Sequence, residues 1–241
     1  MKVVPADELQ HLAVLRHWRR GRTCVHYNGL VRELAREFHR RDPLLATVGW
    51  ANFGFLAVVA VAALVDERTI LGLNPWVKPS KFLVSVGLFA WTVAWFLPYV
   101  QGPRWAVRTV SLGVAGTMTV EIIAILVRSA RGVRSHFNFD TPLDGAIFGV
   151  MGLGIVVNTL MLALLTVLLF ARPAALPRPY LWAVRLGVLL SLAGSAEGAL
   201  MISQGAHAVG VAEGGAGLPY VNWSTEGGDL RAAHAVSLHG L

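Results

Sequence analysis

Five long, almost uncharged apolar stretches constrain this chain more than any other feature of its sequence. Each is about 20 residues or longer, which is the length of helix that crosses the hydrocarbon core of a membrane. Backbone amides in hydrocarbon need partners within their own segment, so each stretch has to be helical. We therefore predict an all-α polytopic transmembrane helix bundle, with five complete spans and a partial sixth. The predicted spans are about 44–65, 82–100, 105–127, 145–171 and 181–203, and the partial helix is 230–241.

The composition agrees with a membrane protein. Hydrophobic residues make up 55% of the chain and charged residues 15%. A soluble surface of this composition would expose too much apolar area to water, which excludes an ordinary cytosolic enzyme or a disordered tail. The single Cys24 excludes an intrachain disulfide and a CxxC motif. We expect the lipid bilayer to be the main partner of this chain.

Residues 1–43 form a basic segment ahead of the first span, with nine Lys or Arg and no apolar core of a signal peptide. Apolar side chains recur there at helical spacing beside a row of Arg32, Arg36 and Arg40, which predicts an amphipathic helix on anionic lipid headgroups. Because binding to lipid headgroups already explains the basic residues, we do not expect nucleic acid to be a partner. Alternate connections carry 14 Lys or Arg on the side of the N-terminus and 7 on the other side. The positive-inside rule then predicts a bacterial inner-membrane protein with a cytoplasmic N-terminus.

Two carboxylates, Glu121 and Glu197, lie inside predicted spans. Ionisable groups in a span are costly and usually face a bundle interior or an aqueous cavity, so both are candidate catalytic residues. Each lies six residues before the outer end of its predicted span, at a shared depth of about 9 Å. The alternative is a structural hydrogen bond or ion pair, for example between Glu121 and Arg128.

Imidazoles and carboxylates gather on the same predicted outer face as the two glutamates. They are typical ligands of zinc, iron or manganese, which predicts a divalent metal ion there. His234 and His239 are five residues apart and do not form the i, i+4 pair of a helical metal motif. None of the five complete spans contains a histidine, which disfavours haem. The candidate metal ligands are His136, Asp140, Asp144, His207 and His234.

The segment 74–82 contains two prolines around a tryptophan and a lysine, which predicts an interfacial elbow before the second span. Lys78 and Lys81 then lie at the level of the outer headgroups. Together with Arg128 they are candidates for binding an anion or a lipid headgroup. The alternative is an interfacial anchor, in which the lysines only hold the end of the helix at the membrane surface.

Three strings, at 74–82, 134–138 and 222–229, together resemble a group of bacterial multi-pass integral membrane proteins of no known activity. The resemblance spans roughly 44–241. It implies the same membrane fold and a chain that continues past residue 241. It brings no activity with it, so it assigns no catalytic residue.

These observations favour an integral membrane protein with a polar, metal-binding site near the outer face. Such a site would carry out metal-assisted hydrolytic or redox chemistry, with one buried carboxylate as general base. A proton-coupled carrier using Glu121 and Glu197 is a second candidate, although no span is clearly broken by Gly and Pro at mid-bilayer. A third is a non-catalytic assembly or scaffold subunit, within a homo-oligomer or a larger membrane complex.

Overall fold

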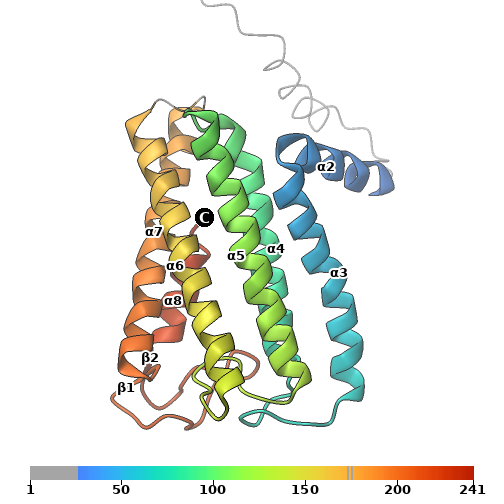
Figure 1. Ribbon diagram of the computed structural model, residues 1–241, viewed down its shortest axis with the longest axis vertical. Helices are drawn as coiled ribbons and strands as arrows, with labels where there is room; N and C mark the ends of the chain where they lie inside the picture. Colours follow the sequence, from blue (N-terminus) through green and yellow to red (C-terminus); the bar gives the residue numbers. More distant parts are fainter. Residues whose placement is uncertain (1–26, 173, 175) are drawn as a thin grey trace, which may run out of the picture. The chain divides into compact units, whose positions relative to one another are not determined.

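The computed structural model describes residues 27–172, 174 and 176–241, which are mostly helical (Figure 1). This confirms the predicted all-α fold. The helices are α2 (Tyr27–Arg41), α3 (Pro43–Val65), α4 (Val77–Phe96), α5 (Arg104–Ala130), α6 (Pro142–Ala171), α7 (Arg178–Gln204) and α8 (Leu230–Leu238), with a 3₁₀ turn η1 (Leu97–Tyr99) after α4. Two short strands, β1 (Ala208–Val209) and β2 (Gly228–Asp229), pair antiparallel.

Five helical segments of the described chain are long and apolar enough to cross a membrane, as predicted. They are Pro43–Val65, Val77–Tyr99, Arg104–Ala130, Pro142–Ala171 and Arg178–Gln204. The helix α8, with nine residues, begins at the predicted Leu230 and ends at Leu238, three residues before the predicted end. Many large apolar side chains on the long helices are exposed, as lipid-facing residues are in a membrane protein. These features support a multi-pass membrane protein.

The described residues divide into two units, 27–37 and 38–241. In the first unit, the described residues belong to α2. This helix includes Arg32, Arg36 and Arg40, the row from which a helix was predicted. Residues 1–26, including Cys24, lie outside the described residues. The predicted interaction of this basic segment with headgroups therefore stays a prediction.

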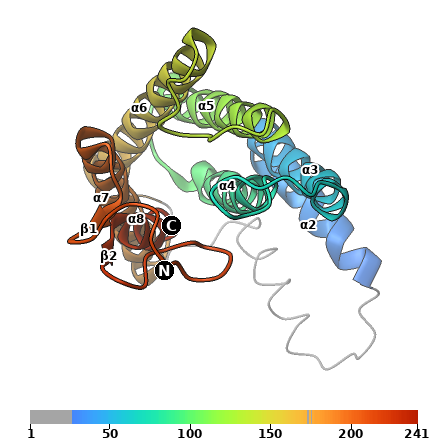
Figure 2. The same ribbon diagram turned by 90° about the horizontal axis from the view of Figure 1, so that it is seen from below.

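In the second unit, each helix packs beside the next one in the chain, from α3 to α8 (Figures 1 and 2). Apolar side chains such as Leu83, Val110 and Leu165 form its buried core. Small residues allow the last two helices to approach closely. A Cβ atom on Gly194 of α7, for example, would lie 2.9 Å from the Cβ atom of Ser237 on α8.

All five spanning helices begin one to five residues earlier than predicted, and the starts of α4 and α6 have a local explanation. The helix α4 begins at Val77 and not at residue 82, so the second half of the predicted elbow is helical. Pro79 is tolerated there because the N–H groups of a first helical turn have no partner within the helix. The helix α6 begins at Pro142, because the hydroxyl of Thr141 accepts a hydrogen bond from the backbone N–H of Asp144 and caps the helix.

Three connections, 66–76, 131–141 and 205–229, lie at one end of the second unit, the lower end in Figure 1. We call it the long-loop end. It corresponds to the predicted outer face. Asp229 closes the last of these connections and caps α8, since its side chain accepts a hydrogen bond from the backbone N–H of Arg231. The long-loop end also holds most of the polar residues that the sequence singled out.

Candidate functional site

Glu121 is buried within the second unit. It lies on α5, about 14 Å along the helix from the terminal Ala130. Its side chain is 5% exposed, and its apolar neighbours Met118, Ile122 and Ile125 are buried as well. A carboxylate in such surroundings needs a polar partner, because burial without one is costly.

The partner comes from the connection 131–141, which follows α5. His136 Nε2 lies 3.6 Å from Glu121 Oε1. The imidazole also lies against Phe82 of α4 and Phe148 of α6, at ring-centroid distances of 6.3 and 6.1 Å. The next residue, Phe137, has a φ of 53°, a left-handed conformation that costs energy in a residue other than glycine. The loop therefore holds this histidine among three helices at the expense of local strain.

Lys78, in the first turn of α4, contacts the other side of the imidazole. Its Nζ lies 3.0 Å from His136 Nδ1. An ammonium group has only donors, so we assign Nδ1 as the acceptor and place the ring proton on Nε2, facing Glu121. Burial, and after it the positive charges of Lys78 and Arg128, hold the pKa of His136 well below its ordinary value. The imidazole is thus neutral near pH 7, and we call these three residues the Glu–His–Lys row.

The row is not a closed network of hydrogen bonds. Glu121 Oε2 is buried and has no hydrogen-bond partner among the described residues. The 3.6 Å between His136 Nε2 and Glu121 Oε1 is also longer than a hydrogen bond. Buried polar atoms in proteins are nearly always paired, and exceptions call for an explanation. The row therefore has capacity for a further partner or a proton.

Arg128 and Asp144 form a separate group at the same end of the bundle. The carboxylate of Asp144 accepts hydrogen bonds from Arg131 and from the hydroxyl of Thr141, both at 2.6 Å. The fully buried Arg128 donates to three backbone carbonyls, one of them that of Asp144. The structural alternative in which Arg128 pairs with Glu121 is not observed. We call Arg128, Arg131, Thr141 and Asp144 the arginine–aspartate group.

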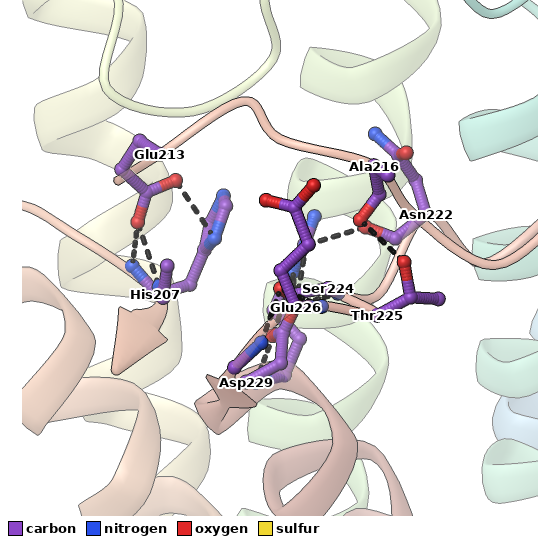
Figure 3. Close-up of polar contacts among 11 residues, drawn as sticks. His207, Glu213, Ala216, Asn222, Ser224, Thr225, Glu226 and Asp229 are labelled. Atoms are coloured by element: carbon purple, nitrogen blue, oxygen red, sulfur yellow. Dashed lines mark hydrogen bonds and ion pairs between the residues drawn. The ribbon is translucent and has the colours of Figure 1, made fainter. Parts of the chain in front are cut away.

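His207 lies in the connection 205–229, where its Nδ1 is 2.9 Å from Oε2 of Glu213, although the angle is not that of a hydrogen bond (Figure 3). The other carboxylate oxygen of Glu213 accepts hydrogen bonds from the backbone at the start of β1. Burial and the charge of Arg231 lower the pKa of His207. Figure 3 also shows Asp229 beside Ser224. The backbone N–H of Ser224 donates a hydrogen bond to the carboxylate of Asp229 at 2.8 Å. These contacts order the loop.

The remaining predicted residues do not join the Glu–His–Lys row. His234 Nδ1 lies 2.7 Å from the carbonyl oxygen of Gly194, and Asp140 is exposed. Glu197 is half-buried, and in the described part of the chain no hydrogen bond or ion pair joins it to Glu121. Across the described residues, no three His, Cys, Asp or Glu side chains gather closely enough to hold a metal ion. A divalent metal at the five candidate ligands stays a prediction.

Lys81 lies one turn along α4 from Lys78 and contacts Tyr220 of the connection 205–229. Its Nζ donates to the carbonyl of Tyr220 at 2.9 Å and lies 5.3 Å from the centroid of the aromatic ring. Ser80 Oγ lies 3.3 Å from the hydroxyl of the same tyrosine. Sequence reasoning missed Tyr220, because no local pattern links it to a helix about 140 positions earlier.

Comparisons of the chain with models of protein families, with curated proteins and with solved structures found no match. No activity is therefore transferred to this chain from another protein.

Proposed function

We propose that this protein is a proton-coupled membrane carrier, in which Glu121 takes up and releases the proton and His136 passes it on. One observation carries the proposal. A buried carboxylate with an unpartnered oxygen faces an imidazole, and the second nitrogen of that imidazole contacts an amine. Groups of this kind inside a membrane protein are costly and usually functional.

The row supports a balanced proton transfer. The Lys78 ammonium gives a proton to His136 Nδ1, and the imidazole gives its Nε2 proton to Glu121. The N–H bonds at Lys78 Nζ and His136 Nε2 break, while an N–H bond forms at His136 Nδ1 and an O–H bond forms at Glu121. Lysine becomes a neutral amine and glutamate a neutral acid. The imidazole changes only its tautomer.

This exchange replaces two charges by two neutral groups. Separated charges buried in a medium of low dielectric constant are costly, whereas the neutral acid and amine are not. The row can thus be charged when its end of the bundle is wet and neutral when that end is closed. A carrier needs this property, since its site has to cross between the two sides without exposing ions to hydrocarbon.

The proposal includes an orientation of the chain in the membrane. The long-loop end would face outward from a bacterial inner membrane, and residues 1–43 would lie on anionic headgroups in the cytoplasm, with residues 44–241 in the membrane. The charge count between the spans supports this orientation. Glu197 stays a predicted second proton site.

Infrared difference spectra of the purified protein between acidic and alkaline pH test the proposal. We expect a carbonyl band of a protonated carboxylic acid in the wild type that is lost in Glu121→Gln. Asp140→Asn is the matched control, because it removes an exposed carboxylate from the long-loop end and should keep the band. A band that Glu121→Gln leaves unchanged would contradict the proposal.

Elemental analysis of the same preparations tests the metal-assisted reaction. Stoichiometric metal that is lost in Glu121→Gln and in His136→Asn would favour hydrolytic or redox chemistry over the carrier. Metal-free protein that still shows the titrating acid would favour the carrier.

A further inference from the structure

The first two turns of α4 carry two positive charges, those of Lys78 and Lys81, that form no ion pair with a carboxylate. Lys78 and Lys81 are three residues apart, so their side chains lie on the same face of the helix. Within the described residues, no ion pair joins either ammonium group to an acidic side chain. Like charges at this spacing repel each other. An anion beside them would relieve the repulsion.

Both ammonium groups have donors left to bind such an anion. Each has three N–H donors, of which Lys78 directs one to His136 and Lys81 directs one to the carbonyl of Tyr220. The positive charges of Arg128 and Arg231 also act on Lys78, and Glu121 is the acid that opposes them. The ammonium groups are held in place while their capacity for hydrogen bonds is only partly used.

The nearby carboxylates are already engaged, with one exception. Asp229 pairs with Arg231 at 2.6 Å, and Asp144 pairs with Arg131 at 2.6 Å. Glu121 is the exception, and it is separated from Lys78 by the imidazole of the row. The N-terminus of α4 adds the positive end of a helix dipole to the two lysines.

We propose that Lys78 and Lys81 bind the anionic group of the ligand, a carboxylate or a phosphate. The inference rests on the proposed function, because it names the class of substrate that the same site would carry with the proton. An anion at Lys78 replaces Glu121 as the counter-charge of the ammonium group. Glu121 then takes up a proton from solvent, so one negative charge enters together with one proton and the net charge of the site is unchanged.

Calorimetric titration with inorganic phosphate tests this site in nanodiscs of phosphatidylcholine. We expect saturable binding that is at least tenfold weaker in Lys81→Gln. Arg134→Gln is the matched control, because it removes one positive charge from an exposed side chain at the same end of the bundle and should bind like the wild type. Titrations in buffers of different ionisation enthalpy should show proton uptake on binding, and Glu121→Gln should bind phosphate without it.

A second arm distinguishes a soluble anion from a lipid headgroup. Native mass spectrometry after incorporation into mixed phosphatidylglycerol and phosphatidylcholine nanodiscs would show retained phosphatidylglycerol in the wild type and in Arg134→Gln, but not in Lys81→Gln, if the anion is a headgroup. Saturable phosphate binding without retained lipid would identify a soluble anion. Either result supports the site.

Absence of binding in both arms, or equal weakening by Lys81→Gln and Arg134→Gln, would overturn the inference. Lys78→Gln gives a second variant if Lys81→Gln does not fold. The outcome is separate from that of the proposed function. If the infrared band depends on Glu121 while neither lysine affects anion binding, the proton site stands and the anion site falls.

Discussion

The Glu–His–Lys row and the arginine–aspartate group both connect α5 to the loop that follows it, yet they are built in opposite ways. In the arginine–aspartate group, the carboxylate of Asp144 is 2% exposed and is bonded to a guanidinium group and a hydroxyl. In the row, the side chain of Glu121 is 5% exposed, but one carboxylate oxygen has no partner and the other lies beyond hydrogen-bond distance from His136.

The difference separates a structural group from a candidate site. A buried carboxylate with both oxygens hydrogen-bonded, as in Asp144, is held in its charged state, because losing the charge would weaken each of those bonds. A buried charge that makes few hydrogen bonds breaks fewer of them when it takes up a proton or when a ligand binds. Mutations in the arginine–aspartate group should therefore lower stability, whereas mutations of Glu121 should abolish proton uptake with little effect on stability.

The largest effect on stability is expected from Asp144→Ala. The substitution leaves Arg131 without its carboxylate and removes the acceptor of the Thr141 hydroxyl. We expect the midpoint of thermal unfolding in detergent to fall by several degrees. Asp140→Ala, an exposed acid of the same loop, is the control and should leave the midpoint nearly unchanged. Equal midpoints for the two variants would show that the arginine–aspartate group is not structural.

The next effect is a loss of stability on acidification that depends on His136. Its pKa in the folded protein is well below the ordinary value of 6.5, so between the two values the unfolded chain binds more protons and stability falls as the pH is lowered. One such group contributes at most about 1.4 kcal/mol per pH unit. Unfolding midpoints between pH 7 and pH 5 should fall less steeply in His136→Asn.

Comparison with other titrating residues separates the contribution of His136 to this acid sensitivity. His207 has a lowered pKa from the same kinds of cause, so His207→Asn should remove a further, separate part of the slope. Asp66 and Asp229 have pKa values below their ordinary 3.8 and act only at lower pH, where stability falls through their protonation. A slope unchanged in His136→Asn would show that this imidazole titrates normally.

A smaller change in stability is expected from Glu121→Gln, even though it should abolish proton uptake. The amide is close in shape to the acid and removes a charge that makes no hydrogen bond in the described structure. We expect a change in the free energy of unfolding within about 1 kcal/mol, in either direction. A large loss in denaturant titrations would place Glu121 with Asp144 as a structural residue.

The smallest change in stability is expected from Arg134→Gln. This side chain is exposed, and substitutions at such surface positions usually alter the free energy of unfolding by no more than about 0.5 kcal/mol. The same denaturant titrations check this value. A larger loss would disqualify the variant as a control for the anion site.

Much of the fold follows from local sequence, but the helix boundaries depend on detail. The five spans were predictable because length and apolar composition are properties of each segment by itself. The beginning of α4 at Val77 was not predictable in the same way. A proline breaks the interior of a helix but fits in the first turn, so Pro79 is compatible with a helix that begins just before it.

The sequence by itself determined a membrane-type helix bundle and the presence of a costly acid within it, because hydropathy and charge can be read along a single segment. It also drew attention to His136 and Lys78, but for different roles. Only the tertiary structure decided that Glu121, His136 and Lys78 form one row and that Asp144 belongs to another group. The reason is physical: hydrogen bonds act over about 3 Å, so pairing between residues 58 positions apart depends on how helices and loops pack.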